Sequence, residues 1–245
     1  LLSLKNQSVK ADEIIVVDNN SSDKTAFIAR KFGVRVIKEK KQGMTYARNK
    51  GFNNAKSEII AKCDADTIVS NNWIERIKYN FSHYQIDALT GRYQFYDLFT
   101  KFYLYANIIF YFNRFFLKGN AVLNGSNLAI SKNIWQKVKN SLCLDDQKVH
   151  EDMDLTIHIL EKGGTTRRDP SIIVETSARR MFKNPISAFG EYPLRGIRTL
   201  YLHKNLLRNL HKLQNDKNQV NQNQYQPLPP LKPVFGADKI GEHTI

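Results

Sequence analysis

Residues 13–22 read Glu-Ile-Ile-Val-Val-Asp-Asn-Asn-Ser-Ser, and they give the clearest indication of the fold class. A run of β-branched residues followed at once by polar turn formers is typical of a buried strand that leads into a loop. Ser22 is a suitable N-cap, and the apolar side of the residues after it predicts a helix that stops at Gly33. The segment therefore predicts a strand followed by a helix.

The same alternation continues along the chain. Apolar runs at 34–37, 58–63 and 88–91 predict further strands, and apolar residues at helical spacing predict helices over 44–55 and 73–84. Strands that alternate with helices usually form a parallel sheet covered by helices, so we expect an α/β fold. In such sheets, ligands bind beyond the carboxyl ends of the strands.

Composition excludes a mostly disordered chain, because 42% of the 245 residues are apolar and 24% are charged. The formal net charge of +14 favours partners that carry phosphate, nucleic acid or anionic lipid headgroups. Only two cysteines occur, Cys63 and Cys143, which suits a reducing cytosol and predicts no structural zinc site. No apolar run is long enough to span a bilayer and no export signal is visible, so we expect a cytoplasmic protein.

Acidic residues follow two of the predicted strands. Asp64-Ala65-Asp66 comes directly after strand 58–63, where the two carboxylates could hold Mg²⁺ or Mn²⁺. Asp18 ends the first strand, where it could accept a hydrogen bond from a base or a ribose hydroxyl. Both sites have a simpler interpretation as turn caps. Arg48, on the helix after a basic loop, could bind a nucleotide or lie on the surface.

A third acidic site, Glu151-Asp152-Met153-Asp154, opens an apolar helical pattern that stops at Gly163. The helix dipole favours acids in a first turn, and an acid at a helix start could also act as a general base. His150 with Asp154, and Asp154 with His158, have the i,i+4 spacing of metal ligands. Since no further histidine lies nearby in sequence, we do not expect a metal there.

The second half of the chain changes in character. Residues 95–116 are rich in Phe and Tyr, which predicts either a buried helix or a helix that binds the acceptor or a membrane surface. Residues 179–208 are strongly basic. The Gln/Asn-rich and then Pro-rich segment 212–245 predicts a flexible tail.

Five motifs together resemble family 2 glycosyltransferases over residues 1 to about 175. They are Val16 to Thr25, Ala47-Arg48-Asn49-Lys50-Gly51, Asp64-Ala65-Asp66, Gly125-Ser126-Asn127-Leu128-Ala129, and Glu151-Asp152-Met153-Asp154-Leu155. The resemblance implies the GT-A fold, a Rossmann-like αβα sandwich with a mostly parallel central sheet. It also implies inverting transfer of a sugar from a nucleotide diphosphate to an acceptor hydroxyl, with Mg²⁺ or Mn²⁺ as cofactor.

The resemblance also implies roles for individual residues. On the acceptor side, Asp152 would be the catalytic base, supported by Glu151 and Asp154. Asp18 and Arg48 would bind the nucleotide, and Asn127 would lie under the donor sugar. Asp66 would hold the metal, and Asp64 would bind the ribose or the metal. We expect a catalytic domain over 1–211, with a nucleotide-binding half at 1–92 and an acceptor half at 93–211.

Three departures from the family pattern refine these expectations. The family's first strand is expected to precede residue 1, so that this chain begins in the helix after it. No Gln-x-x-Arg-Trp motif follows the acidic helix, which favours single-sugar transfer over processive polymer synthesis. Asn19 stands where many members carry a second Asp, which affects the finer nucleotide contacts.

Two other functions compete with sugar transfer. A nucleotidyltransferase also combines a Rossmann-like sheet with carboxylate-bound magnesium, but its Gly-rich basic loop is absent here. A nucleic-acid-binding module would explain the net positive charge and leave the acidic motifs unexplained. We expect a saccharide or lipid-linked acceptor of the cell envelope, and peripheral contact with the anionic inner face of the cell membrane.

Overall fold

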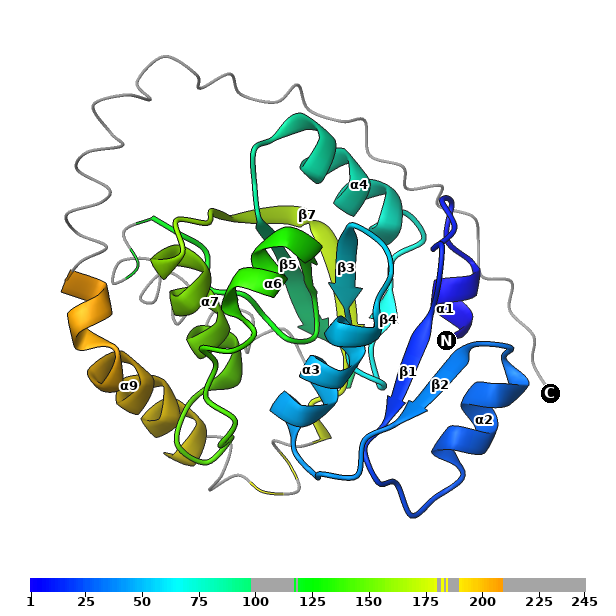
Figure 1. Ribbon diagram of the computed structural model, residues 1–245. Helices are drawn as coiled ribbons and strands as arrows, with labels where there is room; N and C mark the ends of the chain where they lie inside the picture. Colours follow the sequence, from blue (N-terminus) through cyan, green and yellow to red (C-terminus); the bar gives the residue numbers. More distant parts are fainter. Residues whose placement is uncertain (98–116, 118, 180–181, 183, 185–189, 209–245) are drawn as a thin grey trace.

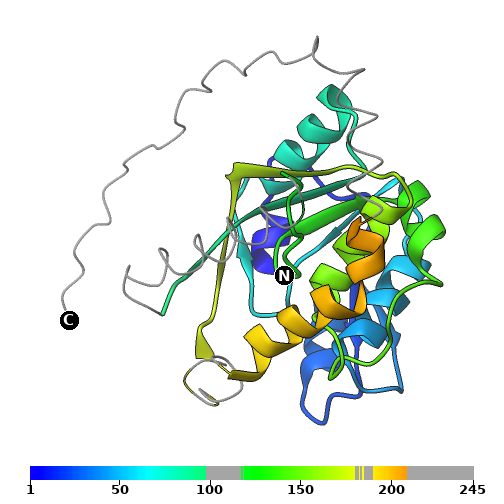
Figure 2. The same ribbon diagram turned by 90° about the vertical axis from the view of Figure 1, so that its left-hand side faces the viewer.

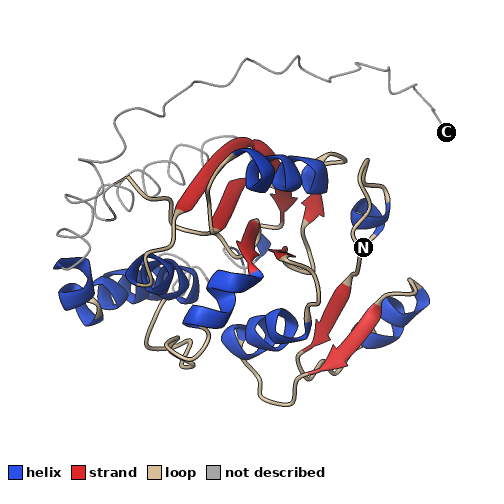
Figure 3. Cartoon of the chain, turned by 45° about the horizontal axis from the view of Figure 1, so that its top comes forward, coloured by secondary structure: helices blue, strands red, loops and turns tan. Residues whose placement is uncertain are grey.

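A computed structural model describes residues 1–97, 117, 119–179, 182, 184 and 190–208. The predicted tail at 212–245 and nearly all of the aromatic segment at 95–116 lie outside these residues. In chain order the elements are α1 (Leu2–Lys5), β1 (Ile15–Asp18), α2 (Thr25–Lys31), β2 (Arg35–Lys38), α3 (Met44–Asn54), β3 (Ile59–Lys62), β4 (Ile68–Val69), α4 (Trp73–His83), β5 (Ala88–Phe95), β6 (Leu128–Ser131), α6 (Lys132–Val138), α7 (Glu151–Glu161), β7 (Thr166–Thr176) and α9 (Tyr192–Leu202). The α/β class is confirmed (Figure 3).

The strands form two sheets among the described residues. β1 pairs in parallel with β2, and the remaining strands form a five-stranded sheet in the order β3-β6-β5-β7-β4. Within that sheet only β5 and β7 are parallel, whereas β6 runs antiparallel to both its neighbours and β4 runs antiparallel to β7. The expectation of a mostly parallel sheet is therefore wrong, because the apolar pattern of a strand reports its burial and not the direction of its neighbours.

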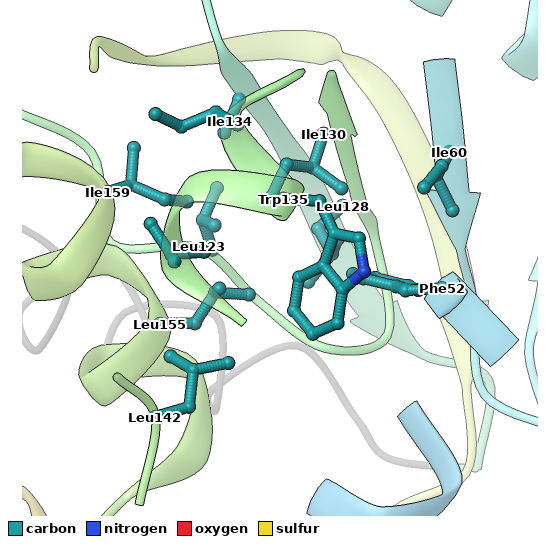
Figure 4. Packing of buried hydrophobic residues seen from close by; sticks show 12 residues of the cluster. Phe52, Ile60, Leu123, Leu128, Ile130, Ile134, Trp135, Leu142, Leu155 and Ile159 are labelled. Carbon is teal, nitrogen blue, oxygen red and sulfur yellow. The ribbon is translucent and has the colours of Figure 1, made fainter. Parts of the chain in front are cut away.

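Helices cover both faces of the five-stranded sheet (Figure 1). On one face, Leu128 and Ile130 of β6 pack with helices α3, α6 and α7, around Trp135 and Phe52 (Figure 4). On the other face, Ala129 of β6 packs with α4, in a cluster that includes Trp73. Successive side chains of a strand point to opposite faces, so the apolar run of β6 is buried on both sides. This arrangement is the predicted αβα sandwich.

Helix ends agree with the sequence at their glycines and differ at one cap. Gly33 and Gly163 follow α2 and α7 with φ of 70° and 75°, the left-handed backbone that favours glycine. Ser22 is not the N-cap of α2, since the helix begins at Thr25 with Lys24 before it. Asp23 binds the start of the helix instead, because its carboxylate accepts a hydrogen bond from the Thr25 amide at 2.9 Å.

Among the described residues, every helix is too short or too polar to cross a bilayer.

Candidate active site

The first residues of α7 place one carboxylate against the loop that precedes β6. Oδ2 of Asp152 accepts a hydrogen bond from the Gly125 amide at 2.7 Å. Its Oδ1 is buried and has no hydrogen-bond partner among the described residues. A Cβ on residue 125 would lie 2.9 Å from this oxygen, so the close approach requires glycine. The arrangement fixes Asp152 and leaves one of its oxygens available for a ligand.

Lys62, at the end of β3, joins this loop to the Asp64-Ala65-Asp66 motif. Its ammonium donates to Oδ1 of Asp64 at 2.8 Å and to the carbonyl oxygen of Gly125. A continuous series of contacts thus runs from Asp64 through Lys62 and Gly125 to Asp152. The two acidic motifs, far apart in sequence, are therefore brought to the same end of β3 and β6.

Asp64 and Asp66 are the accessible carboxylates of the site, with side chains that are 51% and 39% exposed. Oδ2 of Asp66 lies 3.6 Å from the guanidinium of Arg179, just after β7. Hard oxygen ligands that reach solvent suit Mg²⁺ or Mn²⁺, which keep several positions for water and substrate oxygens. The donor set fits the ion that the sequence predicts.

Arg48 lies buried under the start of α7. It is 4% exposed, and its Nη1 donates to the carbonyl oxygen of Glu151 at 3.1 Å. Burial lowers the pKa of Arg48, while the carboxylates of Asp152, Glu151, Asp154 and Asp146 oppose that shift. Its Nη2 has no partner among the described residues. Arg48 therefore supplies positive charge directly beneath the acidic turn.

The pKa of Glu151 is higher than that of an ordinary glutamate. Burial, with repulsion from neighbouring Asp152, raises its pKa to about 7, although Arg48 and Lys62 act in the opposite direction. Two adjacent carboxylates in a poorly solvated place cannot both ionise without cost. At neutral pH a large share of Glu151 therefore carries its proton.

Asp18 and its neighbour Asn19 have different partners. Asp18 accepts a hydrogen bond from the Ser21 amide at 3.0 Å, and its hydrogen bonds with Ser21 lower its pKa. Asn19 reaches across to the basic loop, where its amide oxygen accepts from the Gly43 amide at 2.8 Å at the start of α3. Thr45, in the first turn of α3, donates in turn to Asp146 ahead of α7. It is Asn19, rather than Asp18, that is joined through contacts to the acidic helix.

Asn127 is built into the sheet. It is 1% exposed, and its amide nitrogen donates to the carbonyl oxygens of Arg92 and Ile172 at 3.0 and 3.1 Å. Its oxygen accepts from the indole of Trp73 at 2.8 Å. Both amide hydrogens are thus used within the protein.

Asp154 faces a different environment from Asp152. It is 1% exposed, and its Oδ2 accepts from the Cys143 amide at 3.0 Å. Its Oδ1 lies 3.7 Å from Nε2 of His158 and 3.2 Å from Nε2 of His203, a residue just beyond α9. The sequence gives no sign of His203 at this place, because it lies 45 positions after His158.

Residues 1–136 match the family model described as "Glycosyl transferase family 2". Glycosyltransferase AglE of Haloferax volcanii is 34% identical over 89 residues, which are 34% of this chain and 29% of that protein. Glycosyltransferase GlyA of Streptococcus pneumoniae is 28% identical over 96 residues, 37% of this chain and 14% of that protein. The matches span less than a third of either relative.

Solved structures show the same fold at low sequence identity. The mannosyltransferase PcManGT of Pyrobaculum calidifontis, in complex with GDP-Man and Mn²⁺, has a TM-score of 0.57 at 16% identity, over 92% of this chain and 60% of that one. Glucosyl-3-phosphoglycerate synthase of Mycobacterium tuberculosis, with Mn²⁺, UDP-glucose and phosphoglyceric acid, has a TM-score of 0.56 at 18% identity, over 80% and 71%. The GT-A type of α/β fold is confirmed.

Proposed function

The chain belongs to glycosyl transferase family 2, and from this membership we propose that it transfers one sugar from a nucleotide diphosphate to an acceptor hydroxyl with inversion at the anomeric carbon. The observation that carries the proposal is the connected series of contacts from Asp64 to Asp152. It brings a metal-binding motif and a buried carboxylate to one end of the sheet. An inverting transfer needs these two elements on either side of the sugar.

In this mechanism Asp152 is the general base. The Gly125 amide holds its Oδ2, and its Oδ1 takes the proton from the acceptor hydroxyl as that oxygen attacks the anomeric carbon. Arg48 lies beneath the acidic turn and places its positive charge close to Asp152. Glu151 completes the acceptor side of the helix, whereas Asp154 faces His158 and His203. A single displacement inverts the anomeric centre.

The donor side rests on the other acidic residues. Asp66 would bind Mg²⁺ or Mn²⁺, with Asp64 on the ribose or the metal, and Asp18 would contact the nucleotide. Arg48, buried beneath α7, would support this side through the charge it places there. The ion would neutralise the charge that develops on the leaving diphosphate. Arg179, within 3.6 Å of Asp66, is available to the same phosphates. Asn127 supports the loop under the donor sugar, since its amide hydrogens are bonded within the sheet.

Donor hydrolysis tests this assignment. We expect the protein, incubated with Mn²⁺ and a panel of UDP-, GDP- and dTDP-sugars, to release the nucleoside diphosphate from at least one donor. Chromatography of the products separates this outcome from the competing activity, because a nucleotidyltransferase releases inorganic diphosphate or a nucleoside monophosphate. Absence of nucleoside diphosphate with every donor would contradict the proposal. A nucleic-acid-binding role leaves the buried carboxylates without a purpose, and we do not favour it.

For the acceptor we propose a saccharide or a lipid-linked saccharide of the cell envelope, reached from the cytoplasmic face of the membrane. The support is α9, whose Leu194, Ile197 and Tyr201 are 58%, 62% and 67% exposed. Their spacing places them along one side of the helix, and exposed Arg198 and Lys204 lie nearby. An apolar stripe beside basic residues suits an anionic bilayer surface.

Vesicle sedimentation measures this contact. We expect binding to vesicles that contain phosphatidylglycerol and little binding to neutral phosphatidylcholine vesicles. The double substitution Leu194→Ser and Ile197→Ser should weaken binding by roughly 10-fold or more, because two exposed apolar side chains no longer enter the bilayer. Phe27→Ser is the control, since Phe27 is also exposed but lies on α2. Equal losses in both variants would argue against α9.

A further inference from the structure

Three polar side chains meet in the interior between α7 and the end of α9, away from the contacts of Asp152 described above. They are Asp154, His158 and His203. Their side chains are 1%, 10% and 11% exposed. α9 runs along α7 (Figures 1 and 2), and an apolar cluster that includes Met153 and Leu200 packs these elements together. The cluster is thus a feature of the folded interior.

The hydrogen bonds of the two rings fix where their protons lie. Nδ1 of His203 lies 2.8 Å from the Thr199 carbonyl oxygen, which can only accept, so this nitrogen carries a hydrogen. Nδ1 of His158 lies 2.9 Å from Oε2 of Glu161, so it donates to the carboxylate in the same way. In neutral imidazoles, both Nε2 atoms then present lone pairs.

These lone pairs converge on one point. The two Nε2 atoms are 3.4 Å apart, and they lie 3.7 and 3.2 Å from Oδ1 of Asp154. That oxygen is buried and has no hydrogen-bond partner among the described residues. Three acceptors that face one another with no donor between them repel unless a cation lies among them.

The separations indicate which cation fits. A tetrahedral zinc site with bonds of about 2.05 Å places its ligand atoms about 3.3 Å apart, and an octahedral site of similar bond length places them about 2.9 Å apart. The three distances of 3.2, 3.4 and 3.7 Å match the tetrahedral case. The bonds from Nδ1 to Glu161 and to the Thr199 carbonyl are the outer contacts that orient metal-bound histidines.

We propose that Asp154, His158 and His203 bind one Zn²⁺ ion that fastens the end of α9 to α7. The ion is distinct from the Mg²⁺ or Mn²⁺ of the Asp64-Ala65-Asp66 motif. Two expectations from the sequence are thereby replaced: that no zinc site exists, and that Asp154 and His158 lack a further ligand. The fold supplies His203 as that ligand. By holding α9 against α7, it steadies the helix whose first turn carries Asp152.

Metal content decides the proposal. We expect the full chain, loaded with Zn²⁺ and dialysed, to retain one zinc per molecule and to unfold at a higher temperature than after treatment with a chelator. Replacement by Co²⁺ should give the visible absorption of a tetrahedral site. His158→Asn and His203→Asn should each weaken zinc binding by roughly 100-fold or more, and His83→Asn, at the exposed end of α4, should not.

Glu161→Gln provides a variant that leaves the interior unchanged, since the Glu161 side chain is 31% exposed. We expect it to weaken zinc binding by about 10- to 100-fold, because its contact with His158 orients the ligand. Asp66→Ala should retain the zinc, which separates this site from the donor-side ion. Wild-type protein that retains no zinc and gives no tetrahedral Co²⁺ spectrum would overturn the proposal. The cation would then be a proton on His203, whose Nε2 lies 3.2 Å from Oδ1 of Asp154.

Discussion

Asp152→Asn should lower the turnover of sugar transfer by at least about 100-fold while leaving nucleotide binding nearly unchanged. Asparagine keeps the size of the side chain, and its carbonyl oxygen can still accept from the Gly125 amide. It cannot take a proton from an acceptor hydroxyl. The loss should therefore fall on kcat, measured as nucleoside diphosphate released in the presence of acceptor and Mn²⁺.

Asp145→Asn is the matched control, because this aspartate precedes the same helix and pairs with Lys148 at the surface. We expect near-wild-type turnover from it. Calorimetric titration with UDP shows whether the Asp152 variant still binds nucleotide. Near-normal turnover of Asp152→Asn would remove Asp152 from the role of base, and loss of UDP binding would indicate a structural role instead.

Asp66→Ala should abolish the part of nucleotide binding that depends on a divalent ion. The side chain is 39% exposed and pairs with Arg179 alone among the described residues, so its removal should disturb the fold little. The lost oxygen is the hard ligand that would hold Mg²⁺ or Mn²⁺ beside the diphosphate. Titration with UDP, with and without Mn²⁺, measures the effect directly.

We expect Mn²⁺ to tighten UDP binding to the wild type and to have no effect on UDP binding to Asp66→Ala. Asp12→Ala replaces an exposed aspartate ahead of β1 and should behave as the wild type. If Mn²⁺ tightens UDP binding equally in both variants, the ion lies elsewhere and the assignment of Asp66 is wrong.

Much of the first half of the fold could be predicted from the sequence. β3 lies within the apolar run that predicts it, β1 and β2 overlap theirs and end one residue later, and α3 and α4 begin at the expected Met44 and Trp73. Local patterns suffice here because each strand is a short apolar run and each helix has one apolar side. Glycines also mark helix ends, because the left-handed backbone at these positions favours glycine.

The second half was harder to predict because its strands have no such pattern. β7 contains Arg167, Arg168, Asp169 and Pro170, a sequence typical of a turn, and its pairing with β5 shifts register beside these residues. β6 begins within the motif Gly125 to Ala129 and ends two residues beyond it, at Ser131. Neither the direction of β6 nor its position between β3 and β5 can be deduced from local residue types.

The candidate site, too, could be predicted only in part. The sequence predicts Asp152, Asp64 and Asp66 as site residues, because acids after strands and at helix starts are visible as motifs. It could not show that Arg48 is buried, or that His203 lies beside His158. Both facts depend on contacts between segments distant in the chain, and these arise only from the packing of α3 and α9 on α7.

The buried guanidinium of Arg48 also constrains how the protein can evolve. Its charge is separated from solvent, so Glu151 and Asp152 are its means of compensation. Losing Arg48 removes the buried cation beside the two carboxylates, and losing Asp152 removes compensation from the arginine, so the effects of paired changes are not additive. Neutral drift at these positions must proceed by joint replacement, so a relative that lacks the arginine is expected to have rebuilt the acidic turn as well.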